Sequence, residues 1–161
     1  PRRKPLRTRC ANTPVLPVWA PVLSVCAPKP ASAVEALMRA DVFAMLAVTP
    51  RFTAIRTPRP FFYRLEVWPD ILLPELRVAL EYDTVGKHGL EHVGKREEAD
   101  RRKDRAVRAA GWEVVRVRTG KLERLGPHDV VMSAWTTRSR EALLDALRGI
   151  RGALFVDAYL R

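Results

Sequence analysis

The stretch that decides the fold is Pro69–Asp83, which reads PDILLPELRVALEYD. It contains two uninterrupted apolar triplets, Ile71–Leu73 and Val78–Leu80, on either side of Pro74–Arg77. Uninterrupted apolar runs are typical of central strands that are covered on both faces. The segment between them is short enough for a tight turn, so the stretch predicts a buried antiparallel hairpin.

Both strands of this predicted hairpin carry carboxylates. We take Glu75 and Leu76 as the two residues of the turn. In that register Asp70 lies opposite Glu81, with Cβ atoms about 4.5–5.5 Å apart, and Asp83 points to the same face as Glu81. Like charges at this range raise one another's pKa or require a cation, and Mg²⁺ prefers oxygen ligands. We therefore predict a metal site of Asp70, Glu81 and Asp83, unless a longer turn sends Glu81 to the other face.

Residues 1–31 differ in composition from the rest of the chain. Seven of the thirteen prolines lie within the first thirty residues, which disfavours regular helices and central strands there. A cleaved secretory signal is an alternative, but two prolines interrupt its apolar run. We expect an extended arm over 1–31 and a domain over 32–161. The arm is expected to pack four apolar side chains on the domain or on a partner: Val15, Leu16, Trp19 and Leu23.

The rest of the chain alternates between helical and extended patterns. Ser32 and Glu35 form a capping-box pair for a helix that ends before Pro50, and Gly111 ends a second helix. The order α-β-β-β-α-β-α predicts an α/β fold with a mixed sheet flanked by helices. The expected later helices cover residues 94–110 and 139–147, the last capped by Ser139, and the expected strands cover residues 52–57, 61–73, 76–83 and 113–118.

The chain is strongly basic, and most of the excess lies in its first part. With 29 Lys and Arg against 18 Asp and Glu, the formal net charge is +11. Residues 1–64 hold eleven basic and two acidic residues. Such a charge favours a polyanionic partner, most often nucleic acid, and the arm is either a phosphate-binding segment or a solubilising tail.

The two cysteines, Cys10 and Cys26, do not complete a tetrahedral zinc site with any histidine at a suitable spacing. One disulfide is an option, but we expect two reduced, buried thiols and a cytoplasmic location. No run approaches 18 apolar residues, which excludes a membrane-spanning helix.

The hairpin and the sequence after it resemble the PD-(D/E)XK (restriction-endonuclease-like) superfamily, in particular very-short-patch-repair-type endonucleases and related small endonuclease-domain proteins. The resemblance covers residues 33–125. It departs from the usual pattern at Asp83, where a Lys is common, and at Thr84, where a Gly is common. The matching features are Asp70, the turn Pro74-Glu75, Glu81-Tyr82-Asp83, His88, the charged segment Arg96–Asp104 and the strand segment Gly111–Arg116.

The resemblance implies a restriction-endonuclease-like core and metal-dependent hydrolysis of DNA phosphodiester bonds. Asp70 and Glu81 would hold Mg²⁺ or Mn²⁺, with Asp83 or Glu35 completing the shell, directly or through water. The metal would lower the pKa of its bound water and neutralise charge on the phosphate.

Cationic and basic side chains are expected around this site. Lys87, Lys95 and Lys103 are candidates for the cation beside the scissile phosphate, and His88 or His92 for a general base. The residues expected to contact DNA are Lys87, Lys95, Arg96, Lys103, Arg116 and Arg118.

Two other functions stay open at this level. A non-catalytic nucleic-acid-binding protein could keep the same fold, as Asp83 in place of Lys suggests. An interaction module could dock on a protein partner through residues 1–31. For a nuclease, cutting both strands would take a homodimer or two successive nicks, and a role in DNA repair or in defence is equally compatible with the sequence. We expect Trp112 in the core and not as a platform for base stacking.

Overall fold

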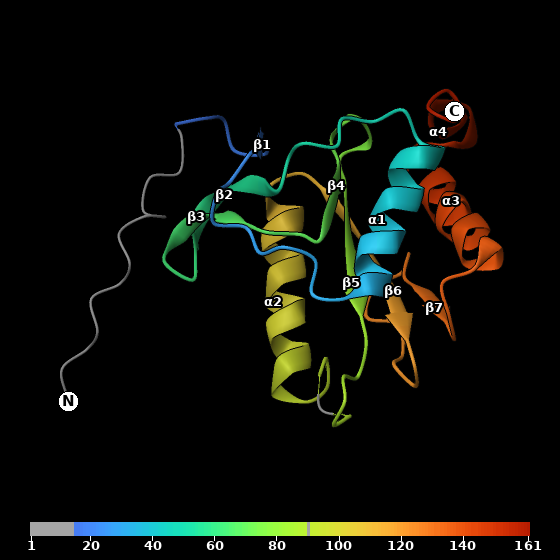
Figure 1. The fold of residues 1–161 in the computed structure, drawn as a ribbon. Coiled ribbons are helices and arrows are strands. Elements are labelled where there is room, and N and C mark those ends of the chain that lie inside the picture. The colour runs from blue at the N-terminus through green and yellow to red at the C-terminus, as the bar shows by residue number, and fades with distance from the viewer. Residues whose placement is uncertain (1–14, 90) are drawn as a thin grey trace.

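The computed structural model describes residues 15–89 and 91–161, and within them the chain is a mixed α/β fold. It has two sheets, one antiparallel with the order β1-β2-β3 and one mixed with the order β4-β5-β6-β7, and four helices (Figure 1). The elements in chain order are β1 (Pro21–Val22), α1 (Ala33–Met45), β2 (Ala54–Phe61), β3 (Arg64–Val67), β4 (Ile71–Leu73), β5 (Val78–Asp83), α2 (Lys95–Ala109), β6 (Glu113–Thr119), β7 (Val130–Met132), α3 (Thr137–Arg151) and α4 (Ala153–Asp157).

The predicted hairpin forms with the predicted register. β4 and β5 pair antiparallel with Ile71 opposite Leu80, as expected for a turn at Glu75 and Leu76. The turn is a single 3₁₀ turn, closed by Arg77 in the left-handed conformation with a φ of 48°. β5 also pairs in parallel with β6, so β5 is an inner strand of the mixed sheet and β4 is its edge strand.

The two faces of the mixed sheet are covered by different elements (Figure 1). On one face, Val78 and Leu80 of β5 pack with Met38 of α1 and Leu143 of α3 in the larger apolar core. On the other face, a smaller core joins the mixed sheet to α2 and to the antiparallel sheet: Ile55, Val67, Leu72, Ala79, Val107, Ala110, Trp112 and Val114. Charged side chains of β5 and β6 extend this second face beyond the smaller core, beside α2.

Three predicted elements have different boundaries in the structure, and the first is the strand predicted over 52–57, which is β2 and runs over Ala54–Phe61. The stretch predicted as one strand over 61–73 is divided between β3 and β4, which belong to different sheets. Pro69 lies between them, and because its nitrogen cannot donate to a strand ladder, the chain leaves the first sheet there. The helix predicted over 139–147 is α3. It begins at Thr137 with Thr136 as its N-cap, because Ser139 fills the third position of the capping box. The short strand β7 was not predicted.

The end of α2 confirms its prediction, and the start of α1 confirms Ser32 as the N-cap but not the capping-box pair with Glu35. Ser32 Oγ accepts a hydrogen bond from the Glu35 backbone N at 3.1 Å. The Glu35 carboxylate does not complete the box and accepts instead from the Ala31 backbone N at 2.8 Å. α2 ends before Gly111, whose φ of 87° is the left-handed conformation expected of a glycine at a helix C-terminus.

The described part of the arm joins the fold through residues other than those predicted. Ala20 and Val22 are buried, and β1 pairs with the edge of β2. Val15 and Leu23 are instead exposed, as are Leu16 and Trp19, although the Trp19 carbonyl accepts from Trp112 Nε1 at 2.7 Å. The arm therefore contributes an edge strand, a position at which Pro21 is tolerated.

The expectation of a reduced thiol is wrong for Cys26, which is disulfide-bonded and half-buried. Cys10 and the first five basic residues of the arm (Arg2, Arg3, Lys4, Arg7 and Arg9) lie outside the described residues. Among the described helices, none is long and apolar enough to cross a membrane.

Candidate functional site

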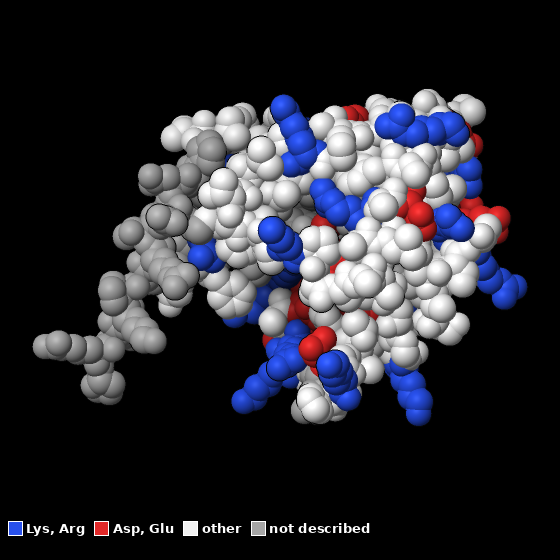
Figure 2. Space-filling view, in the orientation of Figure 1, with Lys and Arg blue, Asp and Glu red and all other residues white. Residues whose placement is uncertain are grey.

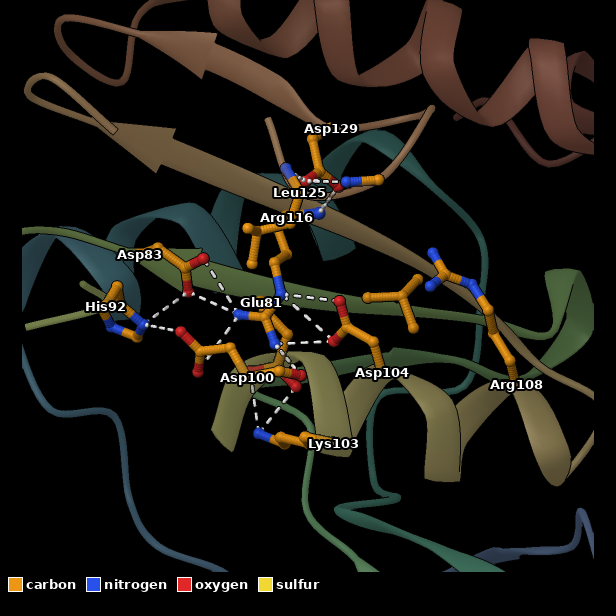
Figure 3. A network of polar contacts seen from close by, with 12 residues as sticks. Glu81, Asp83, His92, Asp100, Lys103, Asp104, Arg108, Arg116, Leu125 and Asp129 are labelled. Carbon is orange, nitrogen blue, oxygen red and sulfur yellow. Dashed lines mark hydrogen bonds and ion pairs between the residues drawn. The ribbon is translucent and has the colours of Figure 1, made fainter. Parts of the chain in front are cut away.

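Four charged side chains from separate parts of the chain gather beside the start of β4, and we call them the acidic cluster: Glu35, Asp70, Glu81 and Lys103. Lys103 reaches across from α2 to Glu81 on β5, with Nζ 2.7 Å from Oε1 and 2.9 Å from Oε2 (Figure 3). Asp70 Oδ2 accepts a hydrogen bond from the Tyr82 backbone N at 2.8 Å, which fixes the Asp70 carboxylate against β5. The predicted hairpin register thus brings Asp70 and Glu81 together.

Glu81 is the buried centre of the acidic cluster, with 4% of its surface exposed. Burial raises the pKa of Glu81 to about 8; Lys103 opposes this rise and Asp70 adds to it. Burial lowers the pKa of Lys103, but the charges of Glu81 and Asp70 outweigh burial, so that pKa is raised. Among the described residues, the Lys103 ammonium is therefore shared between two carboxylates, and burial makes Glu81 easier to protonate than an exposed glutamate.

Glu35 completes the acidic cluster from the first turn of α1. Burial raises its pKa, and so does the charge of Asp70. With all three carboxylates ionised and one ammonium present, the cluster would hold an excess of two negative charges. Glu81 Oε1 is also buried without a hydrogen-bond partner, since its contact with Lys103 lacks hydrogen-bond geometry. Oxygen ligands with this excess charge fit a divalent cation.

Two cavities open beside the acidic cluster. A cavity of about 280 Å³ is lined by Glu35 and Asp70 together with the cationic side chains of Lys29 and Arg39. Lys103 lines the second, of about 270 Å³, on the side of α2. The cluster is therefore accessible to a ligand from two sides, and cationic groups line the approach.

A second group of charged side chains lies next along the same face, and we call it the arginine network: Asp83, His92, Asp100, Asp104, Arg116 and Arg118. Arg116 Nη1 donates to both oxygens of Asp83 at 2.9 and 3.0 Å, and its Nε and Nη2 donate to Asp104 at distances down to 2.7 Å (Figure 3). His92 Nδ1 lies 2.7 Å from Asp100 Oδ2. Both arginines are 1% exposed.

The charges of the arginine network nearly balance. Burial lowers the pKa of His92, but the hydrogen bond to Asp100 and the charge of Asp83 outweigh it, so that pKa is raised. Burial raises the pKa of Asp83, and Arg116 only partly offsets the rise. With His92 protonated, three carboxylates face two guanidinium groups and one imidazolium. The network is neutral in that state.

Among the described residues, Asp83, His92 and Asp100 form a group whose ligand atoms lie within 4.8 Å of one another and could hold a metal ion. Arg116 already donates to both Asp83 oxygens and lies 3.7 Å from Asp100. A metal ion at this position would have to compete with a buried guanidinium. Among the described residues, no arginine donates to the carboxylates of Asp70 and Glu81, and the cation in contact with Glu81 is the flexible side chain of Lys103, so the acidic cluster is the better candidate for a hard cation.

The structure divides the predicted metal ligands between the two groups. Asp70 and Glu81 lie in the acidic cluster with Glu35, whereas Asp83 is paired with Arg116 in the arginine network. Of the three candidate lysines, Lys103 contacts Glu81, and Lys87 and Lys95 are exposed.

The predicted DNA-binding arginines and the predicted histidines lie in different parts of the structure. Arg116 and Arg118 are buried, so the prediction that they line a DNA groove is wrong; both face Asp83. His88 and Arg96 are exposed, and His92 belongs to the arginine network. Figure 2 shows basic side chains projecting at the lower edge of the molecule, near the start of α2 and the loop before it. Trp112 is in the core, as predicted.

Sequence analysis did not find the pairing of Arg116 with Asp100 and Asp104. A signal was present, because an arginine that alternates with valines on a buried strand needs acidic partners. Asp100 and Asp104 lie four residues apart, on one face of the helix that precedes this strand.

Comparisons of the chain with protein-family models, with curated proteins and with solved structures find no match. Its chemistry is therefore argued from the geometry of its own side chains.

Proposed function

We propose that the protein is a metal-dependent DNA endonuclease with a restriction-endonuclease-like core. The observation that carries the proposal is the contact between Lys103 and Glu81, with Asp70 held alongside. Two carboxylates on neighbouring strands and one lysine are the set that the PD-(D/E)XK resemblance implies. The resemblance leads one to expect this lysine at position 83, where the chain has Asp83. Here Lys103 of α2 supplies the ammonium instead.

Asp70 and Glu81 would hold Mg²⁺ or Mn²⁺, with Glu35 completing the shell directly or through water. A cation bound there supplies positive charge and a water of lowered pKa. The number of carboxylates in the acidic cluster supports this assignment, as does Glu81 Oε1, which is buried and contacts Lys103 without hydrogen-bond geometry. Asp83 is left out of the proposed ligand set because Arg116 occupies it.

The side chains of the acidic cluster have distinct tasks in this proposal. Lys103 places an ammonium beside Glu81, where it can stabilise negative charge that develops on the scissile phosphate. The Tyr82 backbone N–H orients Asp70. Lys29 and Arg39 line the adjoining cavity and can bind phosphates on either side of the cleavage point. The net charge of +11 favours DNA as the partner.

A cleavage assay tests the proposal. Supercoiled plasmid, mismatched duplex and single-stranded DNA are incubated with the protein in Mg²⁺, in Mn²⁺ and in EDTA. The variants Asp70→Asn and Lys103→Met are compared with Lys121→Met, a matched control because Lys121 is exposed. We expect cleavage that requires the metal, is lost in Asp70→Asn and Lys103→Met, and is unchanged in Lys121→Met.

Two results would count against the nuclease. Metal-dependent cleavage that survives in Asp70→Asn would remove the site assignment. Tight, salt-sensitive DNA binding without cleavage in any metal would favour the non-catalytic nucleic-acid-binding protein of the same fold. If the protein neither cleaves nor binds DNA, the interaction module that docks through residues 1–31 would be favoured.

A further inference from the structure

The cavity of about 270 Å³ beside Lys103 has an aromatic wall, and we call it the aromatic cavity. Its apolar wall includes the rings of Phe61, Phe62 and Trp68, and Asp100 and Lys103 lie on its polar side. Because Lys103 also contacts Glu81, a ligand in the aromatic cavity lies directly beside the acidic cluster. The proposed nuclease mechanism does not use this cavity.

The turn between β2 and β3 presents one of these rings at a strained backbone position. Phe61 pairs with Arg64, so Phe62 and Tyr63 are the two residues of the turn, and their φ angles are 46° and 70°. A two-residue turn with two positive φ angles normally holds Asn-Gly, because left-handed backbone disfavours bulky side chains. Both aromatic side chains are nevertheless largely exposed, at 54% and 86%. Neither strain nor exposure helps the chain to fold, and for Phe62, which lines the aromatic cavity, this indicates a binding role.

Cationic groups lie against two of the rings. The Arg64 guanidinium is 4.5 Å from the centroid of the Trp68 ring, and the Arg102 guanidinium is 5.3 Å from that of Phe62. An aromatic wall with guanidinium groups at its edge matches a ligand that has a flat apolar face and phosphates on either side. Single-stranded nucleic acids are bound by such combinations of stacking rings and cations.

We propose that the aromatic cavity binds one unstacked nucleobase of the substrate strand, next to the phosphate at the acidic cluster. This inference rests on the proposed function and specifies its substrate class, which is single-stranded DNA or a duplex with an unpaired nucleotide. A paired base would have to leave its stack first, whereas an unpaired one does so at little cost. Asp100 on the polar side can accept a hydrogen bond from the edge of the base.

The test is a binding measurement that needs no cleavage. Short single-stranded oligonucleotides that carry the fluorescent base 2-aminopurine are titrated with the full chain in EDTA. Phe62→Asn is compared with Tyr63→Asn, since both introduce a residue that tolerates left-handed backbone, but only Phe62 lines the cavity. We expect Phe62→Asn to weaken binding roughly tenfold and to abolish the fluorescence change, Tyr63→Asn to bind as wild type, and Phe62→Trp to restore binding.

A second comparison uses unlabelled duplexes. A duplex with one unpaired nucleotide is expected to bind more tightly than the same duplex fully paired, and Phe62→Asn is expected to remove that difference. Equal binding by Phe62→Asn and Tyr63→Asn, or equal affinity of wild type for both duplexes, would overturn the proposal. If filling the aromatic cavity displaces an apolar peptide but not an oligonucleotide, the cavity is assigned to a protein ligand instead.

The two proposals fail in different ways. If no metal supports cleavage but the Phe62 effect on binding is present, the nuclease is excluded and the base-binding cavity is kept. If cleavage depends on metal and on Asp70 but is indifferent to Phe62→Asn and to unpaired nucleotides, the nuclease is kept and the cavity assignment is lost.

Discussion

Glu81 and Lys103 of the acidic cluster lie beside the arginine network (Figure 3), and the two groups differ in how their charges are matched. Each contains three carboxylates. In the arginine network, two guanidinium groups and His92 can neutralise them. In the acidic cluster, Lys103 is the single ammonium in contact with Glu81, and negative charge remains in excess.

This difference separates a structural role from a chemical one. A buried arginine that donates to two carboxylates holds its elements in one arrangement, because removal of any partner leaves a buried charge unpaired. Arg116 ties β6 to Asp104 on α2, and the neighbouring residue on that helix is Lys103. The balanced network thus positions the lysine of the unbalanced cluster. The unbalanced cluster is unfavourable in isolation and becomes favourable when a cation joins it.

Glu81→Gln has the largest expected effect, and it acts on activity. The amide keeps the shape of the side chain but not the charge that holds a divalent cation, so metal-dependent cleavage should fall on the order of a thousandfold. Without metal, the free energy of unfolding should fall by less than when a fully buried pair is broken, because burial favours the uncharged form of Glu81 and Asp70 stays beside Lys103. Single-turnover cleavage and urea unfolding measure the two effects.

The matched control for this variant is Glu123→Gln, because Glu123 is an exposed glutamate. It should leave both cleavage and unfolding unchanged. A Glu81→Gln protein that cleaves at the wild-type rate, or one that no longer folds, would remove the distinction between the two charged groups.

Arg116→Met has the next largest expected effect, and it acts on stability. The substitution leaves Asp104 buried without its cation and Asp83 with only the longer contacts to Arg118 and His92, and breaking a buried pair in this way costs about 3–5 kcal/mol. Urea unfolding monitored by circular dichroism measures the loss. Arg101→Met is the control, since Arg101 makes an exposed pair whose loss should cost no more than about 0.5 kcal/mol. Equal stability of the two variants would show that the arginine network does not hold α2.

The backbone of the hairpin and of α2 could be predicted from local signals. Two apolar triplets around a short polar turn admit few registers, and the register with Ile71 opposite Leu80 is the one observed. The end of α2 at Gly111 is likewise a local property of a glycine with positive φ. The break between β3 and β4 was missed because the apolar pattern continues through Pro69 while the hydrogen-bonding partner changes.

The pairing of charges could not be predicted in the same way. Strand alternation correctly places Asp83 on the face of Glu81, but two residues of strand span about 6.6 Å, so Asp83 reaches Arg116 instead of Asp70. Alternation also shows that Arg116 and Arg118 share a face, without showing which face is covered. That depends on the packing of α2, which is a tertiary contact. The choice of Lys103 among three lysines depends on the same contact.

Addition of Mg²⁺ should stabilise the protein through the acidic cluster and not through the arginine network. At a tenfold excess of free Mg²⁺ over its dissociation constant, the free energy of unfolding should rise by about 1.4 kcal/mol. The rise should be larger above pH 8 than well below it, because the proton on Glu81 competes with the cation. Thermal unfolding with and without Mg²⁺ measures it. Asp70→Asn should abolish the rise and His92→Gln should keep it.

The reverse pattern would change the assignment. If His92→Gln abolishes the rise and Asp70→Asn does not, the cation binds the group of Asp83, His92 and Asp100, whose ligand atoms are close enough to hold one. An imidazole ligand is better suited to Zn²⁺ than to Mg²⁺, so Zn²⁺ would then stabilise more strongly.

His92→Gln has the smallest expected effect, and the pH at which it appears is the informative part. The folded protein raises the pKa of His92 above its usual 6.5, so the imidazolium contributes stability that is fully present below pH 6.5 and is lost as the pH rises through the folded value. The variant should therefore be less stable than wild type in acid, and the two should converge at high pH. His88→Gln, at an exposed histidine, should show no such trend. A constant difference at every pH would mean that His92 contributes by packing and not by its charge. The arginine network would then carry a net negative charge, as the acidic cluster does. The contrast between the two groups would in that case rest on Arg116 and Arg118 alone.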